Sequence, residues 1–281
     1  MTDTERLLHR HSFVELGARQ RAKALLDDFR ELLDPFARLM SPWLQRQGVV
    51  PQADDGVIIA KGALQGRPLV LAAIEGAFQG GSLGEVGGAK MAGALELAAE
   101  DNRNGIPTAA ILLLETGGVR LQEANLGLAA IADIHAAIVD LRQYQPVIGV
   151  VAGSVGCFGG MSIAAGLCSH LLVTREARVG LNGPQVIEQE AGLGEYDSRD
   201  RPFIWAQTGG EQRFASGLAD AYVADDVAAI REQLNEWLEH GLPPVQRSRQ
   251  HGFYLDRLAR LDSAEQLDPL AVRALYEGVR A

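Results

Sequence analysis

Two glycine pairs are the residues of this chain whose type and position could support catalysis. Gly117 and Gly118 follow one continuous apolar run, and Gly159 and Gly160 follow a second. A glycine turn leaves backbone N–H groups accessible because no Cβ stands in the way. Where such a turn leads into a helix, these N–H groups are unpaired and lie at the positive end of the helix dipole. Either pair could therefore hold an anion, or an oxygen that becomes negative during a reaction.

The elements that must position these glycines alternate between strands and helices. Buried strands are predicted by the apolar runs at residues 57–60, 69–74, 108–114 and 146–151. Helices are predicted by the spacing of apolar and small residues over 85–104, 119–142 and 160–167. Each glycine pair would then lie between a strand and the N-terminus of a helix. The alternation predicts an α/β protein.

Composition and pattern divide the chain into three predicted parts. Residues 1–50 are charged and helical in pattern, with the clearest periodicity from Leu16 to Leu33. Residues 51–240 carry the alternating apolar runs and both glycine pairs, and we expect them to form the catalytic domain. Residues 241–281 begin with a linker-like stretch and are expected to form a C-terminal helical extension.

The overall composition argues against several classes of function. The chain has 281 residues and a net charge of -10, whereas nucleic-acid binding requires a basic surface. Its two cysteines, Cys157 and Cys168, lie in apolar sequence, so we expect no disulfide framework, no metal site and a cytoplasmic location. The N-terminus lacks a signal-peptide core, and the uncharged residues 143–174 are too often interrupted by glycine to suggest a membrane span. The glycine pairs also fit neither common nucleotide-binding motif.

Five motifs in order resemble the carboxyltransferase branch of the crotonase superfamily. They are residues 80–84, Lys90, residues 116–123, residues 156–160 and residues 179–184. The resemblance covers roughly residues 10–225 and implies a crotonase-like fold, a spiral of ββα units with layered β-sheets flanked by helices. The chain lacks the four-cysteine zinc ribbon found in one group of that branch. Its length and residues 183–192 are most similar to the β subunits of biotin-independent malonate decarboxylases.

This resemblance implies a reaction and a set of partners. The reaction is the decarboxylation of malonyl-S-acyl carrier protein to acetyl-S-acyl carrier protein and CO2. The implied partners are a γ subunit, which shares the active site, and the carrier protein with its CoA-derived prosthetic arm. Neither biotin nor a directly bound cofactor is implied. Two alternatives stay open: the carboxyltransferase β subunit of a biotin-dependent acyl-CoA carboxylase, and a non-catalytic assembly subunit.

The resemblance also implies roles for the glycine pairs. It places oxyanion-hole glycines at Gly117 and Gly118, where two N–H groups would stabilise the oxygen of a thioester enolate. Removing one such donor costs about 3 kcal/mol in comparable enzymes. Gly159 and Gly160 are a second candidate catalytic pair, although they could instead serve the close packing of the following helix.

Four further residues are candidates for substrate binding. Gly80, Gly81 and Ser82 form a loop that could approach the thioester arm, with a simple connector as the alternative. Arg120 could meet the malonyl carboxylate. It also lies three residues before Glu123 on the predicted helix, where an ion pair within the chain is the favoured interpretation.

Other reactive side chains are given no firm catalytic role. His135 is expected to be a packing or surface residue of its helix. Cys157 has no His or Asp nearby in sequence, so a small buried thiol is the favoured interpretation. Glu195 and Tyr196 remain candidates for protonating the enolate carbon, and the proton donor stays open.

Overall fold

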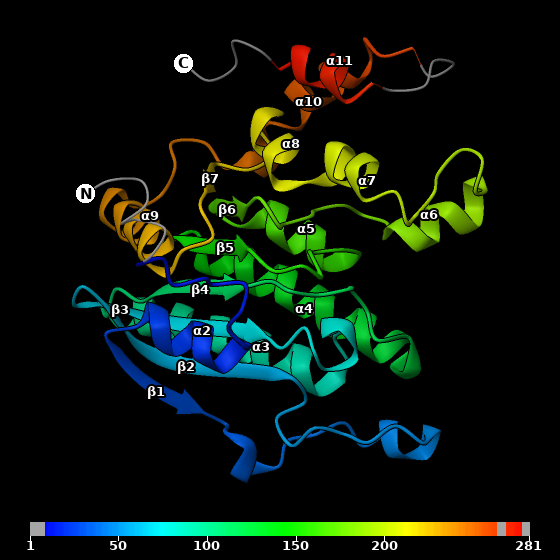
Figure 1. The fold of residues 1–281 in the computed structure, drawn as a ribbon. Helices are drawn as coiled ribbons and strands as arrows, with labels where there is room; N and C mark the ends of the chain where they lie inside the picture. Colours follow the sequence, from blue (N-terminus) through cyan, green and yellow to red (C-terminus); the bar gives the residue numbers. More distant parts are fainter. Residues whose placement is uncertain (1–8, 263–267, 277–281) are drawn as a thin grey trace.

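The computed structural model describes residues 9–262 and 268–276. A seven-stranded sheet forms the centre of its fold. Its strands lie side by side in the order in which they occur along the chain (Figure 1). They are β1 (Asp28–Leu32), β2 (Val57–Leu64), β3 (Arg67–Ile74), β4 (Ala109–Leu113), β5 (Val147–Val151), β6 (His170–Thr174) and β7 (Ala221–Val223). The pairs β1–β2 and β2–β3 are antiparallel, and every later pair is parallel.

Helices cover both faces of this sheet (Figure 1). The α-helices of the described residues are α2 (Ala18–Leu25), α3 (Glu85–Arg103), α4 (Asn125–Leu141), α5 (Gly160–Leu167), α6 (Pro184–Ala191), α7 (Arg201–Thr208), α8 (Gly210–Ala215), α9 (Val227–His240), α10 (His251–Leu258) and α11 (Pro269–Ala274). One buried core joins α3, α4 and α5 to the sheet, and a second joins α2 and α9. Strand β4 serves both, because Ala110 and Leu112 enter the first core and Ile111 and Leu113 the second.

A second, minimal β layer lies beyond the ends of the parallel strands. Its parallel bridges join Leu83 to Val119, Thr116 to Cys157, and Cys157 to Val179. Each bridging segment follows a strand of the main sheet and, for β4 and β5, precedes the next helix. These repeated strand–bridge–helix units, with strands in chain order, confirm the predicted crotonase-like spiral of ββα units.

Two predicted helices begin or end elsewhere. The helix expected from Leu16 to Leu33 ends at Leu25, and residues 28–32 instead form the edge strand β1, which pairs with β2. The helix expected from residue 119 begins only at Asn125. Residues 119–124 instead contain a β bridge and a 3-10 turn, because backbone pairing with Leu83 holds this segment extended. The three-part division at residues 50 and 240 stays a prediction.

The uncharged residues 143–174 form buried elements of the α/β fold. They form β5, a glycine turn, α5 and β6, which are packed largely into the two cores. Among the residues described, the structure contains no helix of the length and apolarity required to cross a membrane.

Candidate active site

The two glycine turns, far apart in sequence, lie directly against each other. The Thr116 N–H donates to the Gly156 carbonyl at 2.7 Å, and the Phe158 N–H donates to the Thr116 carbonyl at 3.0 Å. A methyl group on Gly118 would lie 3.0 Å from the Phe158 carbonyl oxygen. We call the two adjacent backbone segments, residues 117–119 and 159–160, the glycine seam. The structure therefore brings both predicted glycine pairs into one place.

The Gly117 and Gly118 N–H groups are already used within the chain. The Gly117 N–H donates to the Gly80 carbonyl at 2.9 Å, and the Gly118 N–H donates to the Thr116 Oγ1 at 3.0 Å. The expectation that these two groups lie unpaired at a helix N-terminus is wrong, because the helix starts at Asn125. An oxyanion hole formed by these glycines would need other N–H groups of the seam.

Val119 provides one unpaired N–H group at the seam. Its neighbours pair with Leu83: the Leu83 N–H donates to the Gly118 carbonyl, and the Arg120 N–H donates to the Leu83 carbonyl, both at 2.8 Å. In a parallel bridge the residue between such neighbours directs its own N–H away from the partner strand. No acceptor within the described residues bonds to the Val119 N–H. This donor is therefore available on the side away from Leu83.

Gly160 provides the second N–H group, and no acceptor among the described residues bonds to it. It is the first residue of α5, so its N–H has no acceptor within the helix. The preceding Gly159 N–H is used, since it donates to the Leu181 carbonyl at 2.8 Å. A methyl group on Gly159 would lie 3.9 Å from the Val119 nitrogen, which places the two turns next to each other at these donors. Both free N–H groups thus belong to the glycine seam.

Glycine is needed at two positions of the seam. Gly118 has φ of 104° and Gly159 has φ of 60°, in the region that L side chains rarely adopt. Their backbones also pass close together, since a methyl group on Gly159 would lie 3.4 Å from the Gly118 Cα. Glycine at both positions therefore sets the backbone path that presents Val119 and Gly160.

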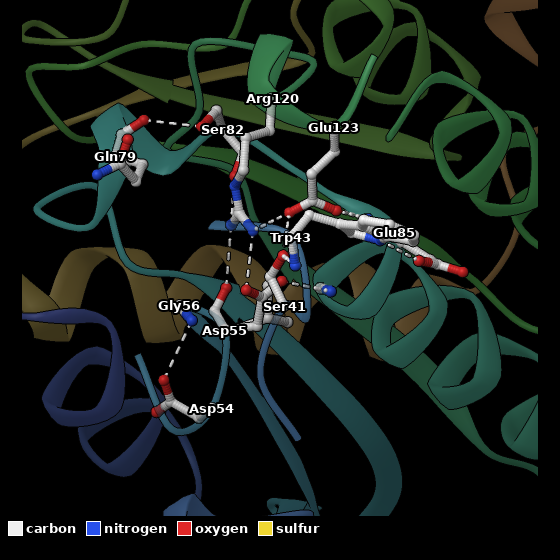
Figure 2. Close-up of polar contacts among 12 residues, drawn as sticks. Ser41, Trp43, Asp54, Asp55, Gly56, Gln79, Ser82, Glu85, Arg120 and Glu123 are labelled. Atoms are coloured by element: carbon white, nitrogen blue, oxygen red, sulfur yellow. Dashed lines mark hydrogen bonds and ion pairs between the residues drawn. The ribbon is translucent and has the colours of Figure 1, made fainter. Parts of the chain in front are cut away.

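The predicted arm-binding loop lies beside the first turn. The Gly80 carbonyl accepts the Gly117 N–H, and Gly81 is buried where an added methyl group would collide with the backbone of Glu115 and Thr116. Ser82 does not present a free hydroxyl, because its Oγ donates to the Gln79 carbonyl at 2.9 Å (Figure 2). The structure brings this loop to the seam. Its role in binding a thioester arm stays a prediction.

Arg120 is completely buried and makes ion pairs within the chain. Its Nη1 donates to Asp55 Oδ1 at 2.8 Å and to Glu123 Oε1 at 2.9 Å, and its Nη2 donates to the Ser82 carbonyl at 3.0 Å (Figure 2). The pairing with Glu123 is confirmed. At 0% exposure Arg120 offers no surface to a malonyl carboxylate in this structure, which favours the ion-pair interpretation, and its role in substrate binding stays a prediction. Arg120 instead fixes the segment that follows Val119.

Glu123 connects this ion pair to the N-terminus of α3. It accepts the Ser41 hydroxyl at 2.7 Å and the Glu85 N–H at 2.8 Å (Figure 2). Burial opposes ionisation of Glu123, but its hydrogen bonds from Ser41, Glu85 and Arg120 keep its pKa below the usual value. For Asp55 burial dominates and raises the pKa, although Arg120 lowers it.

Replacing Glu123 with glutamine should make the free energy of unfolding depend less on pH in the acidic range. The depressed pKa of Glu123 means that its contribution is present above the unfolded-state value, near 4.5, and is lost as the pH falls through the lower folded value. Urea unfolding between about pH 6 and pH 3 measures this slope. Glu100→Gln, an exposed position on α3, is the matched control. An unchanged slope in Glu123→Gln would contradict the assignment.

Sequence reasoning missed a second buried ion pair beneath the seam. Glu115 immediately precedes Thr116, is 7% exposed, and pairs with Arg21 of α2. Its Oε1 also accepts the Val155 N–H at 3.2 Å, on the loop that leads to the second turn. Glu115 thereby holds together the loops before both glycine turns. The available signal was a lone carboxylate at the end of an apolar run.

The remaining candidates take structural positions. His135 Nε2 lies 2.8 Å from the Gly160 carbonyl oxygen, so the ring supports the second turn from α4. Cys157 is fully buried, and burial raises the pKa of its thiol, as expected for an inert core residue. Glu195 and Tyr196 line a separate cavity that none of the seam residues lines.

Comparison with known proteins gives a consistent set of matches. The carboxyl transferase domain model matches residues 10–253. Malonyl-S-ACP:biotin-protein carboxyltransferase MADC of Malonomonas rubra is 36% identical over 253 residues, which cover 86% of this chain and 80% of that protein. A chain of the Pseudomonas malonate decarboxylase hetero-tetramer in complex with malonate is 74% identical, with a TM-score of 0.95, over 98% of this chain and 100% of that one. A chain of the Pseudomonas MdcD–MdcE hetero-dimer is 65% identical, with a TM-score of 0.77, over 90% and 98%.

Proposed function

The chain belongs to the carboxyl transferase domain family, and on that premise we propose that it is the β subunit of a biotin-independent malonate decarboxylase. Two features support this function. The chain is 74% identical, over nearly its whole length, to a chain of a Pseudomonas malonate decarboxylase. Its glycine seam also presents, in one place, two N–H groups that are unpaired among the described residues, and this is the observation that carries the proposal.

The proposed substrate is a malonyl thioester whose free carboxylate leaves as CO2. The bond between the carboxylate carbon and the methylene carbon breaks, and its electron pair moves towards the thioester carbonyl. The carbonyl oxygen then carries the negative charge of an enolate. A proton adds to the methylene carbon and gives the acetyl thioester. Hydrogen-bond donors already placed at the enolate oxygen lower this barrier without further reorganisation.

We assign the enolate oxygen to the glycine seam. The Val119 and Gly160 N–H groups are the donors in this assignment, and they replace Gly117 and Gly118 as direct contacts. Gly160 has the added advantage of lying at the positive end of α5. Gly118 and Gly159 act by shaping the turns. A carboxylate clamped by Arg120 is not part of this mechanism, which agrees with the loss of that carboxylate as neutral CO2.

The remaining parts of the active site are assigned to partners. The Pseudomonas relative forms an MdcD–MdcE hetero-dimer, and we propose that a γ subunit completes the site of this chain at the seam. The malonyl group would arrive on an acyl carrier protein with a CoA-derived arm, and the loop of Gly80, Gly81 and Ser82 is our candidate contact for that arm. No cofactor is proposed to bind this chain directly. The two buried free cysteines favour the cytoplasm as its location.

A biotin-dependent carboxyltransferase is the second candidate function. The Malonomonas rubra relative, 36% identical, is named as a malonyl-S-ACP:biotin-protein carboxyltransferase. The same N–H donors could stabilise the enolate in that reaction. In it the carboxyl group would pass to biotin instead of being released as CO2. Greater identity to a chain of the Pseudomonas malonate decarboxylase favours decarboxylation over carboxyl transfer to biotin.

The two functions differ in their need for biotin. The chain should be coexpressed with its partner subunit, and release of CO2 from malonyl-S-acyl carrier protein should be measured. We expect turnover that excess avidin leaves unchanged, with acetyl-S-acyl carrier protein formed in equal amount. Turnover abolished by avidin, or dependent on an added biotinylated carrier, would support the second function and contradict the first.

A further inference from the structure

A cavity of about 710 Å³ lies between the α6–α8 segment and the C-terminal helices α10 and α11. Figure 1 shows these helices together at the β7 end of the sheet. Its volume is within the range typical of small-molecule sites. The proposed reaction makes no use of this cavity.

Most of the cavity wall is apolar. It is formed by aliphatic and aromatic side chains, including Ile187, Phe203, Leu218, Leu258 and Val272. Such a wall favours a ligand with a hydrocarbon body, because burial of apolar surface is worth about 25 cal/mol per Å².

Arg213 is the one cationic side chain among the described residues that line the cavity. Its Nε donates to the Val179 carbonyl at 2.7 Å, and no carboxylate of the described residues lies within ion-pair distance of it. Burial lowers the pKa of the Arg213 guanidinium, but an arginine side chain remains charged in proteins. A half-buried cation without a counter-ion among the described residues would be stabilised by an anion at this point.

Tyr196 adds an unused hydroxyl close to this cation. Its hydroxyl is buried and has no hydrogen-bond partner among the described residues, and its ring packs edge-on against Phe203 with 5.2 Å between centroids. Burial raises the pKa of Tyr196, while the charges of Arg178 and Arg213 lower it, so the phenol lies within the field of both guanidinium groups. Glu195 is the lone acidic residue of the lining in the described chain, and it is exposed.

We propose that this cavity binds an amphipathic monocarboxylate, a medium-chain fatty acid, with its carboxylate at Arg213 and Tyr196 and its hydrocarbon chain along the apolar wall. A single cation matches one negative charge, which argues against di-anionic phosphate esters. A planar carboxylate can accept two parallel N–H donors from a guanidinium. The apolar wall then accounts for the remaining volume. This site is independent of the proposed decarboxylase reaction.

Octanoate is a suitable probe, and 1-octanol is the matched neutral molecule. Binding of each to the full-length chain in complex with its partner subunit should be measured by titration calorimetry. We expect octanoate to bind at least tenfold more tightly than 1-octanol. Arg213→Met and Tyr196→Phe should each weaken octanoate binding, the first by at least tenfold, since hydrogen bonds to charged groups are the stronger kind. Arg199→Met, which removes an exposed arginine outside the lining, should leave octanoate affinity unchanged.

Three results would overturn the proposal. They are the absence of octanoate binding at millimolar concentration, equal affinity for 1-octanol, and an Arg213→Met variant that binds octanoate as well as wild type does. Thermal unfolding of each variant shows whether it is folded. Tyr196→Phe keeps the ring and its packing, so it tests the site even if Arg213→Met does not fold. Decarboxylation measured in parallel separates failure of this site from failure of the proposed function.

Discussion

Replacing Gly118 with alanine should lower kcat for malonyl-thioester decarboxylation by at least about a hundredfold. The residue has φ of 104°, and an added methyl group would meet the Phe158 carbonyl oxygen at 3.0 Å. The turn must therefore shift, and the next residue is Val119, whose N–H is our proposed donor. Loss of a single oxyanion donor costs about 10²–10³ in kcat in comparable enzymes. The measurement is single-turnover decarboxylation by the complex with its partner subunit.

Gly117→Ala is the control for Gly118→Ala, because it adds a methyl group at the neighbouring position of the same turn. Gly117 has no positive φ, and its added methyl group would meet only the Gly80 carbonyl oxygen, at 3.4 Å. We therefore expect it to retain far more activity than Gly118→Ala. Gly166→Ala, in open space on α5, is the control for expression and folding. Full activity in a folded Gly118→Ala complex would exclude the seam as the oxyanion site and would favour a non-catalytic assembly role.

The fold was largely predictable because its strands are buried on both faces. Apolar runs such as residues 108–114 can be recognised without any knowledge of their partners, and β2 and β3 contain the predicted runs 57–60 and 69–74. The edge strand β1 was not predictable in this way. Its residues 28–32 are half-buried or exposed, and only backbone pairing with β2 makes them a strand.

The site was predictable in its residues but not in its hydrogen bonds. Sequence spacing indicated that Gly118 and Gly159 occupy turns, and both do have positive φ. Which N–H groups remain free depends on carbonyls that are distant in sequence. Gly80 lies 37 residues before Gly117, and Leu181 lies 22 residues after Gly159. Pairing with Leu83 also keeps residue 119 out of a helix, which no local propensity could reveal.

Arg120→Met should destabilise the chain by about 3–5 kcal/mol, because it leaves Asp55 and Glu123 as buried carboxylates without their counter-ion. All three side chains have 0% exposure. In Arg120→Met the two carboxylates can therefore avoid an unpaired buried charge only by protonation or by structural rearrangement. Arg120→Lys should lie between wild type and Arg120→Met. Lysine keeps the charge but lacks the planar fork that reaches both carboxylates and the Ser82 carbonyl. Urea unfolding at neutral pH measures both variants.

Arg199→Met is the control, since the Arg199–Asp197 pair is solvent-exposed and exposed pairs contribute little.

The destabilisation by Arg120→Met should also diminish towards low pH. Burial already raises the pKa of Asp55, so this carboxyl becomes neutral as the pH falls and then needs no counter-ion. Equal unfolding midpoints for Arg120→Met and Arg199→Met would contradict the assignment of Arg120 as the centre of a buried charge network. Arg120 also follows Val119 directly in the chain and donates to the Ser82 carbonyl. A folded Arg120→Lys variant should therefore lose turnover as well, because the Val119 N–H would no longer be held in position.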